Sequence, residues 1–306
     1  MNSDSKNARK KRGAYLSVGS NTLLTMLKLV VGLFTGSISI ISESLHSLND
    51  LVAALIATYA VHQSSKPPDS EHTYGHGKIE SVSALLEASL IIFAAVFIIH
   101  ESIDRMINPR EIDYMEAGIL VMFISVCVNI YVGLKLKRTA SATSSAALEA
   151  DSAHLLTDVY TALGVFIGLV VIKVTNYYIL DPIIAILVAI YIIKVGVSLI
   201  IKSARELMDA RISAEEEKKV RRIVNSHNTE FVEMHALRSR VSGSDRYIDM
   251  HIVVAKDTSI KKAHELADHI EKEIAEKMPG YHTMVHVEPC DENCDKCGNR
   301  KKCGKA

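Results

Sequence analysis

The sequence predicts a membrane all-α domain of six transmembrane helices, followed by a small cytoplasmic α+β domain. Two observations support this fold class. Hydrophobic residues make up 48% of the 306 residues, which is high for a soluble enzyme of this length. They are also concentrated in long runs before residue 202, whereas residues 209–306 are mixed and charged. We therefore expect a transmembrane domain over residues 13–208 and a separate domain over residues 209–289.

The apolar runs have the length of membrane spans. A helix needs about 20 mostly apolar residues to cross about 30 Å of hydrocarbon. The first run is too long for a signal peptide and no small-residue cleavage pattern follows it, so it is interpreted as the first span. Six stretches qualify, at residues 14–36, 38–62, 80–105, 114–136, 146–173 and 177–201.

The basic residues predict the orientation of these spans. The segment KNARKKR within residues 1–12 is basic, as are the loop KPPDSEHTYGHGK and the segment KLKRT, whereas FTGS and VTNYYIL carry no Lys or Arg. Because basic loops stay in the cytoplasm, the N-terminus is expected there, and an even number of spans returns the C-terminus to the same side. We therefore predict a multi-pass protein of the cell membrane. We do not predict nucleic-acid binding from the basic N-terminus.

The residues after 209 alternate between helical and strand patterns. A helix begins after Ser213, and a second helix is stopped by Pro279 and Gly280. Two strands joined by the turn VSGSD lie between the helices, and a last strand follows them. The order helix-strand-strand-helix-strand predicts an α+β sandwich with its helices on one sheet face. In sequence order the segments are SAEEEKKVRRIVNSH, FVEMHALRSRV, RYIDMHIVVA, SIKKAHELADHIEKEIAEKM and HTMVHVE.

Two of the predicted spans contain the same polar pattern. SESLHSLNDLVAAL and EADSAHLLTDVYTAL both carry His-x-x-x-Asp, which places the two side chains on one helix face. Counted from opposite membrane faces at helical rise, His46 and Asp50 lie about 12 and 18 Å deep, and His154 and Asp158 about 13 and 20 Å deep. Both pairs therefore reach the membrane midplane.

Two imidazoles and two carboxylates at one depth form a tetrahedral set suited to zinc, and cobalt or cadmium could also use it. Helix–helix hydrogen bonding is the alternative role for each residue. However, ionisable residues at the membrane centre cost several kcal/mol and usually mark an ion path. Because these ligands must lose protons to bind a metal, protons compete with it. The pairs predict metal/proton exchange.

These motifs resemble the cation diffusion facilitator family. HSLND, HLLTD, the loop stretch from Tyr74 to Glu80 (YGHGKIE) and the helix–strand tail carry the resemblance over about residues 12–290. The resemblance implies six transmembrane helices, a ferredoxin-like cytoplasmic domain, and a homodimer in the lipid bilayer that exports divalent metal ions against protons. Members with Asp at the first His tend to be less selective, so His46 favours Zn²⁺.

The resemblance also implies further sites. In the loop, Asp69, His72 and His76 match the family's second metal site, and their spacing alone allows a metal cluster. Lys78 and Asp209 resemble a charged interlock between the membrane and cytoplasmic parts. The residues that match a binuclear, dimer-bridging cytoplasmic site are His235, His251, His264, His286 and Glu288. Strand alternation independently separates His251 from the apolar face, and it puts His286 and Glu288 on one face.

The remaining polar residues are left open. The tail over residues 290–306 has a cysteine spacing compatible with a metal knuckle, and an unstructured tail is the alternative; its cysteines are Cys290, Cys294, Cys297 and Cys303. No role is assigned to the other ionisable residues in or near the spans, Lys28, Glu43, Glu87, His100 and Glu149.

The predicted function is therefore a Zn²⁺/proton antiporter and not an enzyme. One alternative is an antiporter of the same family with Mn²⁺, Fe²⁺, Co²⁺ or Cd²⁺ as its main substrate. Another is a membrane sensor that binds zinc without transporting it. An intramembrane metallohydrolase is disfavoured because the sequence lacks an HExxH motif.

Overall fold

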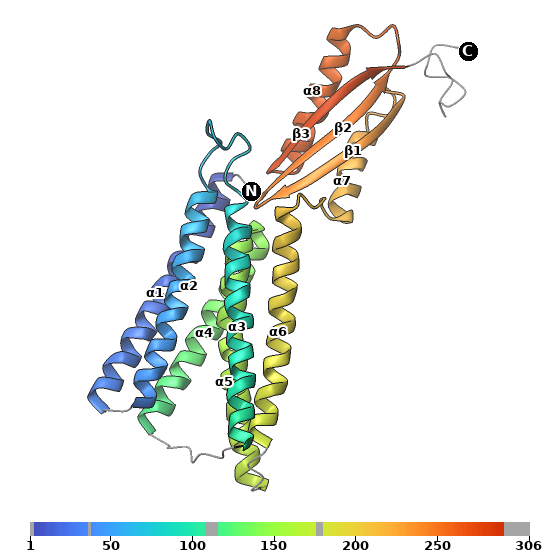
Figure 1. The fold of residues 1–306 in the computed structure, drawn as a ribbon. Helices are drawn as coiled ribbons and strands as arrows, with labels where there is room; N and C mark the ends of the chain where they lie inside the picture. The colour runs from blue at the N-terminus through green and yellow to red at the C-terminus, as the bar shows by residue number, and fades with distance from the viewer. Residues whose placement is uncertain (1–2, 36–37, 108–115, 176–179, 291–306) are drawn as a thin grey trace. The chain divides into compact units, whose positions relative to one another are not determined.

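The computed structural model describes residues 3–35, 38–107, 116–175 and 180–290 (Figure 1). The chain divides into two compact units, a helical unit over Asp4–Arg205 and an α/β unit over Glu206–Ala306, apart from the first three residues.

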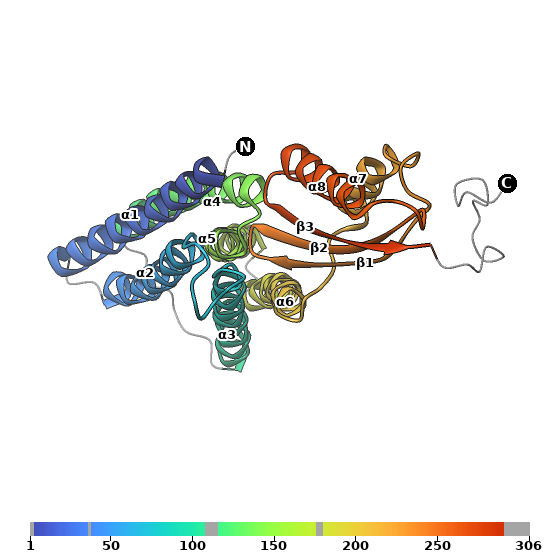
Figure 2. The same ribbon diagram turned by 90° about the horizontal axis from the view of Figure 1, so that it is seen from above.

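The described part of the helical unit contains six long helices. α5 lies against α2, α3 and α4 (Figures 1 and 2). The ranges are α1 Ser3–Thr35, α2 Ile38–Ser64, α3 Ile79–Ile107, α4 Glu116–Thr143, α5 Ala146–Thr175 and α6 Leu180–Leu207. These helices correspond to the six apolar stretches predicted from the sequence.

Three of these helices are long and apolar enough to cross a membrane, by length and composition within the described residues: Ser5–Val31, Ile79–Asp104 and Pro182–Leu207. Large apolar side chains on the outside of the unit are exposed, for example Phe93 (73%) and Leu187 (62%), as expected of surfaces that face lipid. Three predicted spans are supported in this way. The other three remain predictions.

A buried ion pair joins the ends of several helices. Lys10 Nζ in α1 lies 2.7 Å from Glu80 Oε1 in α3, and both side chains are at most 1% exposed. The Ser64 hydroxyl of α2 donates to the same carboxylate oxygen over 2.7 Å. The hydroxyl of Ser145, which directly precedes α5, donates to Glu80 Oε2. One carboxylate therefore connects the starts of α3 and α5 to α1 and α2.

The α/β unit has the predicted element order: α7 Ala214–Asn225, β1 Glu233–Ser242, β2 Asp245–Val254, α8 Ile260–Lys277 and β3 Tyr281–Pro289. The sheet order is β1-β2-β3, with β1 antiparallel and β3 parallel to the central β2. The β1–β2 turn places Gly243 at φ +59°, a conformation that glycine adopts without steric cost. The result is a small mixed sheet.

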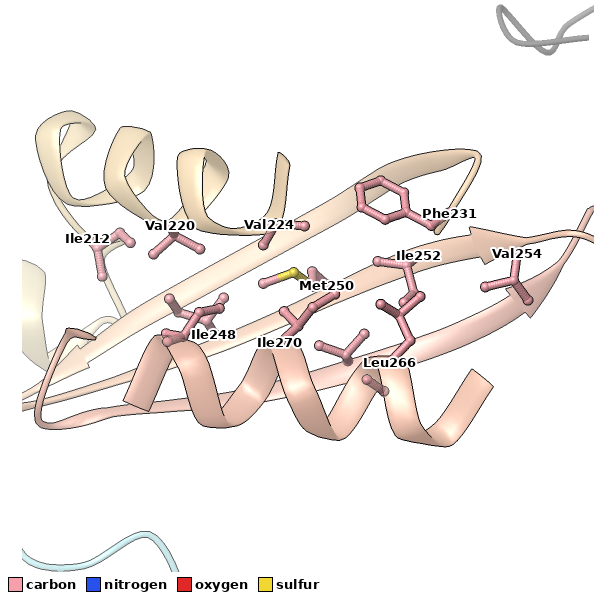
Figure 3. Packing of buried hydrophobic residues seen from close by; sticks show 13 residues of the cluster. Ile212, Val220, Val224, Phe231, Ile248, Met250, Ile252, Val254, Leu266 and Ile270 are labelled. Carbon is pink, nitrogen blue, oxygen red and sulfur yellow. The ribbon is translucent and has the colours of Figure 1, made fainter. Parts of the chain in front are cut away.

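Both helices of this unit cover one face of the sheet (Figure 3). Ile248, Met250 and Ile252 of β2 are buried against Val220 of α7 and Ile270 of α8. Because side chains alternate along a strand, the residues between them lie on the opposite face, and there Asp249 is exposed and His251 partly exposed.

Glu216 fixes the start of α7 to the sheet. Its carboxylate accepts hydrogen bonds from the backbone N–H of Ser213 (2.9 Å) and the hydroxyl of Tyr281 (2.7 Å), and it lies 3.3 Å from Nε of Arg246. Burial raises the pKa of Glu216, but these hydrogen bonds and the charge on Arg246 outweigh it and lower the pKa to about 2. The contacts therefore stabilise the ionised form.

We expect Glu216→Gln to lower the free energy of unfolding of the α/β unit by about 1–2 kcal/mol at pH 7, after allowance for partial solvent screening. The folded-state pKa lies below the usual value of 4.5, so the stabilisation is present above that pH and is lost as the pH falls toward 2. Hydrogen–deuterium exchange of β2 in the full chain measures the loss. Glu215→Gln is the control, because Glu215 is 79% exposed, and an equal loss in both variants would contradict the prediction.

Candidate metal centres

The membrane helices bring three of the four predicted transport ligands together. Nε2 of His154 in α5 lies 3.2 Å from Oδ1 of Asp50 in α2, and both residues are buried. Asp158 follows His154 by one helical turn. One ligand atom from each of the three residues lies within 4.8 Å of the others. Ligands about 2.05 Å from a tetrahedral zinc lie about 3.3 Å apart, so small side-chain movements would complete a metal site.

The fourth predicted ligand, His46, belongs to α2, one turn before Asp50. Its side chain lies outside the described residues. The helical spacing places positions 46 and 50 on one face of α2, so its participation remains a prediction from the sequence.

Two further carboxylates are buried near this cluster. Glu87 of α3 is 0% exposed and Asp151 of α5 is 1% exposed. Glu87 accepts a hydrogen bond from the Ser83 hydroxyl (3.2 Å) and interacts electrostatically with Asp151 and His154. Neither residue is assigned a role from the sequence. Their burial depends on packing between α3 and α5, and the only signal in the sequence was an acid within an apolar stretch.

The loop between α2 and α3 gathers its three predicted ligands. Oδ1 of Asp69 accepts hydrogen bonds from the backbone N–H groups of His72 (2.6 Å) and Glu71 (3.0 Å). The hydrogen bond from His72 is the main cause of a lowered Asp69 pKa. Oδ2 of Asp69 lies 3.2 Å from Nε2 of His76, and the two imidazole rings are 4.5 Å apart. Gly75, at φ +80°, allows the turn that returns His76 to Asp69.

The sheet aligns three of the predicted histidines in one row. His235, His251 and His286 are direct register partners across β1, β2 and β3. Glu288 joins them: its carboxylate lies 3.2 Å from Nε2 of His235 and 2.8 Å from Nδ1 of His251. A β-bulge with Ala236 at φ +50° follows His235, and bulges often direct a side chain at a functional site. The row lies on the sheet face opposite the helices.

The other predicted residues are not brought to these clusters within the described chain. His264 is exposed on α8, in the helix layer and not on the face of the histidine row. Lys78 and Asp209 belong to different units; within its own unit, Asp209 lies 3.8 Å from Arg240.

The tail is described only at its start. The backbone N–H of Cys290 donates to the carbonyl oxygen of Val254 over 2.9 Å. Cys294, Cys297 and Cys303 lie outside the described residues, so the predicted knuckle remains a prediction.

One cluster was missed in the sequence. His227, His269 and Glu273 also offer ligand atoms within 4.8 Å of one another. The i, i+4 spacing of His269 and Glu273 on a predicted helix was a usable signal. The third residue, His227, lies more than 40 positions earlier in the chain, and no local sequence pattern connects it to the other two.

The chain is similar to known proteins over most of its length. The family model described as the cation efflux transmembrane domain matches residues 14–208, and that of the cation efflux protein cytoplasmic domain matches residues 212–290. The uncharacterised transporter sll1263 of Synechocystis sp. is 33% identical over 279 residues, which cover 91% of this chain and 90% of the relative. The cation-efflux pump FieF of Citrobacter koseri is 30% identical over 281 residues, covering 91% and 92%.

A solved structure concerned with the candidate zinc transporter CzrB is 31% identical in sequence. The match covers 26% of this chain and 99% of that chain, with a TM-score of 0.26.

Proposed function

We propose a metal-export function from one premise: this chain belongs to the cation efflux family, also called cation diffusion facilitators, whose members are membrane transporters and not enzymes. The divalent cation we propose as its main substrate is Zn²⁺, which leaves the cytoplasm in exchange for protons.

The observation that carries the proposal is the cluster of Asp50, His154 and Asp158 between α2 and α5, in which Asp50 and His154 are buried and Asp158 is partly buried. Together with His46 these residues supply two imidazoles and two carboxylates, the donor set that favours Zn²⁺ over the hard cations Mg²⁺ and Ca²⁺. Protonation of either ligand type removes its capacity to bind metal. Protons that enter from outside would therefore release the metal, and loss of those protons toward the cytoplasm would reset the site.

The surrounding parts have supporting roles in this proposal. The loop cluster of Asp69, His72 and His76 would bind metal beside the transport path. The histidine row with Glu288 would bind cytosolic metal and stabilise a homodimer through the cytoplasmic domain. We place the protein in the cell membrane as a six-span chain with both termini in the cytoplasm, because the basic loops connect the spans on that side.

The test is a flux measurement in reconstituted vesicles. The purified chain is inserted into liposomes that contain a zinc-sensitive dye, Zn²⁺ is added outside, and a pH gradient is imposed. We expect zinc influx that depends on the direction and size of the gradient and that disappears when a protonophore removes it. Gradient-independent leakage, equal to that of protein-free vesicles, would reject the antiporter.

Two further arms distinguish the alternatives. Mn²⁺, Fe²⁺, Co²⁺ and Cd²⁺ are compared in the same vesicles, and a faster gradient-dependent flux of any of them would reassign the main substrate. A membrane metal sensor predicts a different result: no flux of any ion, but a zinc-dependent change in hydrogen exchange of β1, β2 and β3.

A further inference from the structure

The α/β unit carries a second group of metal-ligating side chains, on the side of the sheet away from the histidine row. His227 follows the C-terminus of α7, whereas His269 and Glu273 lie one turn apart on α8. Both helices cover the sheet face formed by Ile248 and Met250. The group is therefore separated from the histidine row by the sheet itself.

The three side chains converge closely. Nε2 of His227 lies 2.5 Å from Oε2 of Glu273. The imidazole rings of His227 and His269 are 5.0 Å apart between centroids, at an interplanar angle of 82°. One ligand atom from each residue lies within 4.8 Å of the others. The side chains of His227 and Glu273 are mostly buried, 13% and 19% exposed, whereas His269 is exposed.

The outer contacts hold the two inner ligands in a binding orientation. Glu230 Oε1 lies 3.4 Å from Nδ1 of His227, on the side of the ring away from Glu273. A carboxylate on one imidazole nitrogen fixes the ring and leaves the other nitrogen for a metal, as is common around protein-bound zinc. Lys277 donates to Oε1 of Glu273, so Oε2 is the oxygen directed at His227.

We propose that His227, His269 and Glu273 form a binding site for a divalent cation of the zinc class, with water as the fourth ligand. Two imidazoles and one carboxylate favour Zn²⁺ or Co²⁺ over Ca²⁺ and Mg²⁺, which prefer oxygen ligands. The bound metal would connect the end of α7 to α8 and would stabilise the helix layer of the unit. The inference does not depend on transport, because none of its residues lies in the helical unit.

The contact between His227 and Glu273 has a second explanation, a simple ion pair, and His269 distinguishes the two. An ion pair does not need His269, whereas a metal site loses a ligand without it. His269 is also exposed, so His269→Ala should fold normally. His282→Ala is a matched control, because His282 lies on β3 of the same unit, away from the group and beside Asp245.

The experiment counts bound metal in the full-length chain in detergent. Wild type and variants are dialysed against the same buffered free Zn²⁺, and zinc per chain is measured by mass spectrometry. We expect His269→Ala and His227→Ala each to bind one Zn²⁺ fewer per chain than wild type, and His282→Ala to bind as many. Zinc should also slow hydrogen exchange in α8 of wild type and of His282→Ala, but not of His269→Ala.

Equal zinc contents in wild type, His269→Ala and His227→Ala would overturn the proposal and leave the ion pair as the explanation. Proton-driven zinc flux is measured on His269→Ala in parallel. That variant should retain wild-type flux, so a failure of this site and a failure of the antiporter give different results.

Discussion

Vesicles containing Asp158→Ala are expected to show proton-driven zinc flux reduced by more than about 100-fold, since loss of mere outer-shell partners already costs 10–100-fold in metal affinity or activity. The variant removes one carboxylate from the Asp50, His154 and Asp158 cluster, and with it a proposed metal ligand and a negative charge that would offset the charge of the cation. The measurement is the rate of zinc influx that the imposed pH gradient drives. Asp158→Asn keeps the shape without the charge and should lose nearly as much.

The matched control is Glu149→Gln on the same helix. Glu149 pairs with Lys202, and the side chains of this pair are 40% and 51% exposed. Vesicles containing Glu149→Gln should show the same zinc flux as those containing wild type. If Asp158→Ala also retained wild-type flux, or if both variants lost it equally, the buried cluster would not be the transport site.

Helical periodicity in the sequence predicts which residues of α2 and α5 approach one another, and the structure groups Asp50, His154 and Asp158. Residues four positions apart share a helix face, so each His-x-x-x-Asp pair was predicted from one segment. Pairing α2 with α5 required only equal depth in the membrane. The structure places Asp50 beside His154 as that reasoning required. In the sheet, strand alternation predicted which face His251 occupies, and the register then aligns it with His235 and His286.

Contacts between distant segments could not be predicted in this way. Lys10 belongs to a stretch interpreted as a topology signal, yet it is buried and paired with Glu80. Likewise, His227 lies just after α7 and contacts Glu273 of α8, more than 40 positions later in the chain. Local sequence periodicity cannot predict such contacts, because they depend on how whole helices and strands pack together.

The Lys10–Glu80 pair gives the second large expected effect. Glu80→Ala would leave the ammonium of Lys10 buried without its carboxylate, and it would also remove the acceptor of the Ser64 and Ser145 hydroxyls. Breaking a buried pair from one side typically costs about 3–5 kcal/mol. We therefore expect the thermal unfolding midpoint of Glu80→Ala in detergent to fall sharply.

A double-mutant cycle separates the pair itself from the general effect of altering the site. Because an apolar pair leaves no charge uncompensated, Lys10→Met with Glu80→Leu should be more stable than either single variant, with a coupling energy of about 0.5–3 kcal/mol. Glu149→Gln breaks an ion pair of the same unit that is exposed, and it should change stability by no more than about 1 kcal/mol. If Glu80→Ala were no more damaging than Glu149→Gln, the carboxylate would not hold the helix ends together, and α1 would have to be held by apolar contacts such as those of Ala14.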